Sequence, residues 1–253
     1  MFRGIMKISV RAVALILSLA LSIPAFAGDK KKDQKKTDAA ATIIDSGSFG
    51  VFVSGRRVAT ETFVIKQLID SSVTSSDIKL ENSKETQHSE LQLTPRGDLM
   101  RYDWKESGGQ EKGETSVEPA QQFLMQKVKA NDKYTEQPYL MPNSSAVLDD
   151  YFFSHRELLL WRYLGSGCIP KQGQQGCELQ KAQYGFVVPR QRSSGMATLN
   201  YIGKETVQIH GAIKELDKFS MTSDFGDWLL YLDENKKLVR VIILGESTEV
   251  IRD

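Results

Sequence analysis

The sequence lacks an excess of charge of either sign, a long hydrophobic run and all but two cysteines. Its 33 lysines and arginines nearly balance 32 aspartates and glutamates, which leaves a formal net charge of +1. A chain without a basic excess is not expected to present a nucleic-acid-binding surface. The apolar run Ala12–Ile23 is shorter than the roughly 20 residues that a membrane-spanning helix needs. We therefore expect no nucleic-acid partner and no stable membrane span once the leader described below is removed.

The motifs of the common catalytic and cofactor-binding classes are also missing. The sequence contains no H-E-x-x-H, C-x-x-C or G-x-S-x-G pattern, the signatures of zinc proteases, dithiol redox sites and nucleophile elbows. The three histidines, His88, His155 and His210, are too far apart to form a metal-spaced pair, and we expect each to be a surface or satisfied core residue. The sequence thus predicts no catalytic residue, no metal site and no cofactor.

The first 27 residues have the pattern of a signal peptide. Three basic residues, Arg3, Lys7 and Arg11, precede the apolar run Ala12–Ile23, and small residues then allow cleavage after Ala27. A retained N-terminal anchor is the alternative interpretation. No cysteine follows the cleavage site directly, so a lipidated lipoprotein is not expected. The pattern predicts an exported protein, periplasmic or secreted.

A lysine-rich segment, residues 28–41, follows the predicted cleavage site. It is typical of a disordered leader that keeps an exported chain soluble, and a membrane-surface tether is the alternative. Without the signal peptide the formal charge is −2, and without the lysine-rich segment it is about −4. Residues 42–253 are long enough for one large domain or for two small ones. Because no Pro/Ser-rich linker divides them, we predict a single β-rich domain.

Short runs of β-branched and aromatic residues, separated by turn residues, predict antiparallel strands through most of this domain. Residues 42–70 form an expected opening hairpin with its turn at Ser54–Arg57, and Ile202–Glu205 is an expected turn near the C-terminus. The other predicted strands are Val73–Glu81, Ser89–Thr94, Leu99–Lys105, Thr115–Glu118, Val207–Ile213, Lys218–Ser223, Trp228–Leu232 and Leu238–Leu244. The pattern contains no β-α-β crossover, so the predicted fold class is mainly β (α+β).

One segment breaks the β pattern and predicts a long helix over Ser145–Leu164. Asn143 or Ser144 can cap its start, and Asp149 and Asp150 are placed to interact with the positive end of the helix dipole.

The second half of this predicted helix is apolar on more than one side. Leu158–Trp161 are consecutive apolar residues, whereas a helix on a flat surface needs only one apolar stripe. We therefore expect a curved antiparallel sheet or incomplete β-barrel that wraps one long helix, with Arg156, Glu157 and Arg162 at the rim.

Cys168 and Cys177 lie ten positions apart, with Gly and Pro between them. In an exported chain this arrangement predicts a disulfide bond. A redox-active pair is the alternative, but such thiols usually lie two residues apart beside the start of a helix.

The order of these parts resembles a group of exported bacterial domains of unknown function. The resemblance rests on the opening hairpin GSFGVFVSGRRVATETFVI, the turn segment LTPRGDLMRYDW and the closing stretch from SSGMATLNYIGKETVQIH to the C-terminus. These domains are similar in outline to the lipoprotein carriers LolA and LolB. The resemblance implies a half-barrel with an apolar concave side, and it carries no catalytic signature.

The sequence favours a non-catalytic exported protein that binds an apolar ligand, such as a lipid or acyl chain, or an amphipathic segment. The ligand would lie between the sheet and the helix, and the expected partner is a lipid or an envelope protein. The candidate ligand-binding residues are Tyr151, Phe152, Leu159, Trp161 and Trp228. A structural envelope protein with a fully packed core is the second interpretation, and a hydrolase without a recognisable motif is the third.

Overall fold

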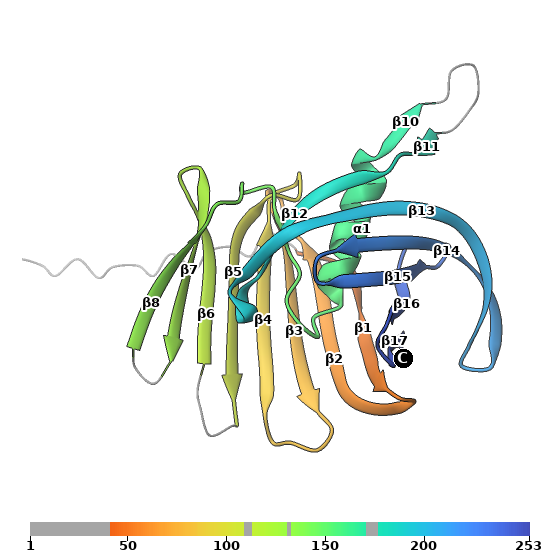
Figure 1. The fold of residues 1–253 in the computed structure, drawn as a ribbon, viewed down its shortest axis with the longest axis horizontal. Coiled ribbons are helices and arrows are strands. Elements are labelled where there is room, and N and C mark those ends of the chain that lie inside the picture. The colour runs from red at the N-terminus through yellow and green to blue at the C-terminus, as the bar shows by residue number, and fades with distance from the viewer. Residues whose placement is uncertain (1–40, 109–112, 131–132, 171–176) are drawn as a thin grey trace, which may run out of the picture. The chain divides into compact units, whose positions relative to one another are not determined.

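A computed structural model describes residues 41–108, 113–130, 133–170 and 177–253 (Figure 1). The predicted signal peptide, residues 1–27, lies outside the described residues, as does the lysine-rich leader up to residue 40. In the part of the chain that the structure describes, no helix has the length and apolarity required to cross a membrane.

Fifteen of the described strands form one curved sheet, in the order β8-β7-β6-β5-β4-β3-β2-β1-β17-β16-β15-β14-β13-β12-β9 (Figure 1). Neighbours pair antiparallel except β9 and β12, which pair in parallel. The N-terminal strands are β1 (Thr42–Val53), β2 (Arg56–Gln67), β3 (Ser72–Leu80), β4 (Thr86–Leu93), β5 (Leu99–Ser107), β6 (Gly113–Ala120), β7 (Phe123–Ala130), β8 (Lys133–Tyr139) and β9 (Ala146–Val147). After helix α1 (Ser154–Ser166) come β10 (Cys168–Pro170), β11 (Cys177–Leu179), β12 (Ala182–Val188), the 3₁₀ turn η1 (Pro189–Gln191), β13 (Ser193–Ile209), β14 (Ala212–Ser223), β15 (Gly226–Leu232), β16 (Leu238–Ile243) and β17 (Thr248–Arg252).

Strand β2 illustrates how the two-residue alternation produces the core. Its buried residues are Ala59, Glu61, Phe63 and Ile65, on every second position. The side chains of a strand point alternately to the two faces of the sheet, so these four share one face. Three are apolar, as the sequence pattern requires. Glu61 is the exception, and its partner is the start of the helix, described below.

The two ends of the sheet are connected by side chains. Gln126 on β7 donates a hydrogen bond of 2.7 Å from Nε2 to the Pro189 carbonyl in η1, and Gln137 on β8 donates one of 3.0 Å to the Arg192 carbonyl. A core cluster spans the same junction: Leu91, Leu99, Tyr102, Val117, Leu124, Tyr139, Val147 and Val187. Burial and side-chain hydrogen bonds therefore join the N-terminal strands to β9 and β12.

The expected turn at Ile202–Glu205 is wrong. Strand β13 continues through this segment, and its pairing with β14 shifts register between Tyr201 and Gly203. Gly203 has a φ of +139°, a conformation that favours glycine, so the strand bends there without ending. The chain reverses instead at His210 and Gly211, both with positive φ. Beyond the bend, Val207, Ile209 and Leu216 of β13 and β14 pack with Tyr231 and Val239 in a separate small core.

The predicted long helix is also wrong in its start, its length and the position of its charged residues. Helix α1 begins at Ser154, nine residues after the expected start, and has 13 residues. The segment before it pairs with β12 through β9. Arg156 and Glu157, expected at the rim, are 3% and 0% exposed. Burial of the helix N-terminus against β2 explains the difference, because polar groups of the helix must then find partners inside the protein.

The two cysteines lie on the small hairpin that follows the helix. In the backbone register of β10 and β11, Cys168 lies opposite Leu179 and Cys177 lies opposite Pro170. Their side chains are outside the described part of the structure, so the disulfide stays a prediction. We expect alkylation of the native protein to leave its mass unchanged, and alkylation after reduction to add two labels. Two labels without reductant would contradict the disulfide.

Candidate functional site

The start of helix α1 is held by a carboxylate from the sheet. Glu61 on β2 accepts hydrogen bonds from the Phe153 amide (2.6 Å) and the Ser154 hydroxyl (2.6 Å). A carboxylate at this end satisfies amides that have no partner within the helix and interacts favourably with the helix dipole. Burial raises the pKa of Glu61 to about 7, although these hydrogen bonds act in the opposite direction. Glu61 therefore fixes the position of the segment that leads into the helix.

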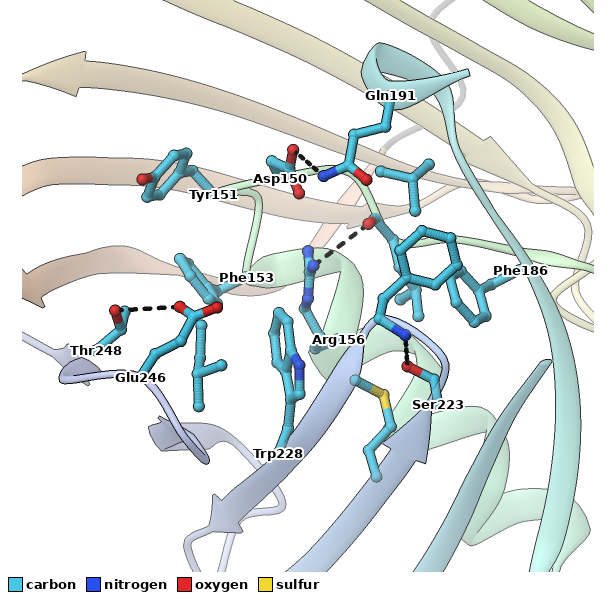
Figure 2. Close-up of a pocket in the computed structure, with 15 residues that line it drawn as sticks. Asp150, Tyr151, Phe153, Arg156, Phe186, Gln191, Ser223, Trp228, Glu246 and Thr248 are labelled. Carbon is cyan, nitrogen blue, oxygen red and sulfur yellow. Dashed lines mark hydrogen bonds between the residues drawn. The ribbon is translucent and has the colours of Figure 1, made fainter. Parts of the chain in front are cut away.

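Beside this segment lies a cavity of about 260 Å³ (Figure 2). One wall comes from residues 148–153 and the first turn of α1, and the others come from β12, β14, β15, β16, the start of β17 and the adjoining turns. Most of the lining side chains are apolar: Leu148, Tyr151, Phe153, Phe186, Val188, Met221, Phe225, Trp228 and Ile243. The polar ones are Asp150, Arg156, Gln191, Ser223, Glu246 and Thr248.

Two aromatic rings on one side of the cavity pack edge to face. The ring centroids of Phe186 and Phe225 are 5.4 Å apart. Gly195 lies against both, and a Cβ atom there would come within 3.0 Å of Phe225 and 3.2 Å of Phe186. The absence of a side chain at Gly195 therefore allows this pair to pack where it does.

Arg156 is the one basic residue among the described lining residues of the cavity. Its guanidinium lies 4.6 Å from the ring centroid of Trp228 and 5.4 Å from that of Phe153. Nη1 donates to the carbonyls of Asp149 and Phe152, and Nη2 donates to the carbonyl of Leu148 at 3.3 Å. Nε is buried without a hydrogen-bond partner. Burial lowers the pKa of Arg156 to about 10.

A second buried network, centred on Asp149, holds the segment of residues 148–153 that precedes α1. Asp149 is 0% exposed. It accepts a hydrogen bond of 2.6 Å from the Tyr102 hydroxyl and lies 3.2 Å from Arg190 Nε. Burial raises the pKa of Asp149, while Arg190 and the Tyr102 hydroxyl act to lower it. The interpretation of Asp149 as a helix-dipole residue is therefore wrong, because its carboxylate pairs with residues outside the helix.

The first turn of α1 also contacts the C-terminal strands, through Glu157. Glu157 accepts a hydrogen bond of 2.9 Å from the Leu238 amide, and its Oε1 lies 3.6 Å from Arg252 Nη1. Arg252 also donates to both oxygens of Asp45 at 2.8 Å. Burial and the neighbouring Asp45 carboxylate outweigh Arg252 and raise the pKa of Glu157 to about 8. These contacts give the helix a fixed position on β1, β16 and β17.

Of the five residues predicted to bind ligand, the structure brings Tyr151 and Trp228 together at the cavity. Phe152 and Leu159 are 0% and 3% exposed and lie in the main core. Trp161 lines a separate hollow of about 730 Å³, and its indole nitrogen donates to the Lys236 carbonyl at 2.6 Å.

The prediction from sequence missed Arg156 as a cavity residue and missed the wall formed by Phe186, Met221 and Phe225. The available signal for Arg156 was its place between Phe152-Phe153 and the Leu158–Trp161 run. No local signal could identify the wall, since its residues come from strands distant in sequence.

Comparisons with known proteins give one fold similarity. Neither a protein-family model nor a curated protein sequence matches the chain. The chain is similar to the crystal structure of a beta-barrel-like protein of domain of unknown function DUF1849 from Brucella abortus. The two are 7% identical, the match covers 84% of this chain and 97% of the other, and the TM-score is 0.49. The resemblance to the LolA and LolB carriers stays a hypothesis.

Proposed function

We propose that the protein is a non-catalytic, exported binding protein that holds a small apolar ligand or the end of an acyl chain in the 260 Å³ cavity. The observation that carries the proposal is the cavity itself, whose walls are mostly aromatic and aliphatic. Concave sites of this composition are typical of small-molecule binding. In this proposal the curved sheet and α1 act as an incomplete barrel, and export depends on the predicted signal peptide.

The volume limits what can bind. An apolar cavity of about 150 Å³ is large enough to bind benzene, and this one, at about 260 Å³, has room for a somewhat larger molecule. A medium-length acyl chain or a single aromatic ring with a short substituent has this size. The cavity is therefore suited to one chain or ring, and a complete phospholipid would extend outside it.

Its polar groups favour binding over catalysis. Ser223, a lining hydroxyl next to Phe225, accepts a hydrogen bond from the Phe225 amide and donates to the Gly226 carbonyl, both at 3.2 Å. These are the bonds of a turn residue. Among the described lining residues there is no histidine to act as a base for it, and of the two carboxylates Asp150 already accepts a hydrogen bond from Gln191 while Glu246 is exposed.

The test is a native mass spectrum of the chain from residue 28, purified under gentle conditions, followed by organic extraction. We expect a bound apolar molecule in the wild-type protein and an at least tenfold smaller bound fraction in Phe225→Glu, because the new carboxylate would enter the apolar wall. Phe225 is 41% exposed in a turn, so this change leaves the main core intact. Ile213→Glu, at a site 77% exposed and distant from the cavity lining, is the matched control.

A structural or interaction protein of the cell envelope is the second candidate. It is favoured by the completeness of the main core, where Phe152, Leu160 and Tyr163 of the helical region are all 0% exposed. A ligand-free wild-type mass, together with failure of added apolar molecules to bind, would support this candidate and contradict the binding proposal.

A further inference from the structure

We propose that the ligand of this cavity is an apolar monocarboxylate, whose carboxylate is bound by the Arg156 guanidinium and whose body lies against Trp228 and Phe225. This inference rests on the proposed function and specifies the ligand class. Arg156 is 3% exposed and lines the cavity. Figure 2 shows its side chain among the lining residues, with Phe153 and Trp228 close to it.

The hydrogen bonds of Arg156 are incomplete. A guanidinium has five N–H donors, and three are used, for the carbonyls of Leu148, Asp149 and Phe152. The Nε–H and one Nη2–H remain, and Nε is buried with no acceptor. A buried donor without a partner is costly, and unsatisfied groups of this kind in folded proteins call for an explanation. A bound carboxylate would supply the missing acceptor.

The charge of Arg156 has no direct counter-ion. Among the described residues no carboxylate lies within ion-pair distance of its guanidinium, and Asp150, Glu61 and Asp149 act on it only from farther away, whereas Arg190 and Arg252 each have a buried aspartate partner. Burial of a cation without a direct counter-ion is unfavourable. The carbonyl dipoles and the Trp228 and Phe153 rings compensate in part. A monoanion in the cavity would complete this compensation, and a neutral ligand would not.

Two carboxylates of the lining, Asp150 and Glu246, could instead attract a cation. The Asp150 carboxylate already accepts a hydrogen bond of 2.8 Å from Gln191 Nε2 (Figure 2). Glu246 is exposed, so its charge is screened by solvent. The Arg156 guanidinium is more deeply buried than either and meets the ligand in a medium of lower dielectric constant. The preference should therefore be for an anion.

The test compares three probes of similar length by isothermal titration calorimetry at neutral pH: octanoate, 1-octanol and octylammonium. We expect octanoate to bind at least tenfold more tightly than 1-octanol, because hydrogen bonds to a charged group are among the stronger ones. In Arg156→Lys, which keeps the charge but loses the planar donor group, octanoate should bind roughly tenfold more weakly while 1-octanol is unaffected. In Arg156→Met the preference for octanoate should vanish.

Arg162→Lys is the matched control. Arg162 also lies on α1 and donates to backbone carbonyls, those of Gly97 and Ser144, but it is outside this cavity. Circular dichroism in the near ultraviolet verifies the fold of each variant. If Arg156→Met fails to fold, Arg156→Lys and the three-probe comparison still decide the question.

The outcomes separate this inference from the proposed function. Equal binding of octanoate and 1-octanol, or a preference for octylammonium, would overturn the carboxylate inference and leave apolar binding in place. Binding of octanoate that Arg156→Lys does not weaken would also overturn it. Failure of all three probes to bind would overturn both.

Discussion

Asp149→Ala should lower the free energy of unfolding by about 3 kcal/mol, because it removes the carboxylate partner of a largely buried arginine. Asp149 is fully buried, and Arg190 Nε lies 3.2 Å from its Oδ1. The change also leaves the Tyr102 hydroxyl, now 2.6 Å from Asp149, without its acceptor. An unpaired buried charge and an unpaired buried hydroxyl are both expensive. Equilibrium unfolding in urea at pH 7 measures the loss.

Asp103→Ala is the control for this prediction. Asp103 pairs with Arg101, which lies two positions earlier on the same strand, β5. The side chains of Asp103 and Arg101 are 40% and 51% exposed. A surface ion pair of this kind contributes about 0–1 kcal/mol, so the control should unfold almost like the wild type. If the two variants lost similar free energies of unfolding, the prediction that the buried Asp149 network stabilises the protein more than a surface ion pair would be contradicted.

Raising the pH from about 6.5 to about 9 should lower the free energy of unfolding by about 3 kcal/mol. The groups responsible are Glu61 and Glu157, whose pKa values are raised by burial from 4.5 to about 7 and about 8. In this range the folded protein retains protons that the unfolded chain has released. The stability from these groups is fully present below pH 4.5 and is lost as the pH rises through the folded-state values.

His155 is the reason why this prediction starts at about pH 6.5 and not at a lower pH. This residue is 1% exposed, and both ring nitrogens are buried without a hydrogen-bond partner. Burial, followed by the charges of Arg156 and Arg190, lowers its pKa well below 6.5. Below that pH the unfolded chain binds a proton that the folded protein does not, so His155 destabilises the fold in acid. About one pH unit above 6.5 it is neutral in both states, and the two glutamates determine the trend at higher pH.

Conservative variants assign the effect to each carboxyl. Glu157→Gln should remove about 2 kcal/mol of the pH-dependent loss and Glu61→Gln about 1 kcal/mol, because the folded-state pKa of Glu157 lies farther above 6.5 than that of Glu61. Glu234→Gln, in an exposed turn, should leave the dependence unchanged. Unfolding curves at several pH values test this. A stability that stays constant or rises between pH 6.5 and 9 would contradict the prediction.

Local patterns in the sequence were sufficient for most of the strands. The opening hairpin, the strand from Val73 and the strands Lys218–Ser223, Trp228–Leu232 and Leu238–Leu244 follow from alternating apolar residues and short turns, and the structure has them at nearly these positions. The predicted strand Val207–Ile213 is wrong, because the chain reverses within it at His210 and Gly211. The turn at Ile202–Glu205 was wrong because glycine permits either a turn or a bend within a strand. Only the pairing of β13 with β14 distinguishes these two outcomes.

The candidate site was less predictable than the fold. Tyr151 and Trp228 could be proposed as ligand-binding residues because they are aromatic. The other residues that line the cavity come from five strands, α1 and the segments next to them, which are distant in the sequence. Arg156 was placed at the rim because an arginine is rarely buried. Its burial depends on three carbonyls of the preceding loop, whose conformation depends in turn on Glu61 and Arg190.

The sequence by itself determined a mainly β chain with one helix and no recognised catalytic motif, because strand alternation, turn residues and motif spacing are local properties. Only the tertiary structure decided where α1 begins, which charged residues are buried, and that Arg156 lines an aromatic cavity. Glu61 shows the physical reason. Glu61 lies on β2, and Phe153, whose amide it binds at the start of α1, is 92 positions later in the sequence. Their interaction exists only once the sheet has brought the two segments together.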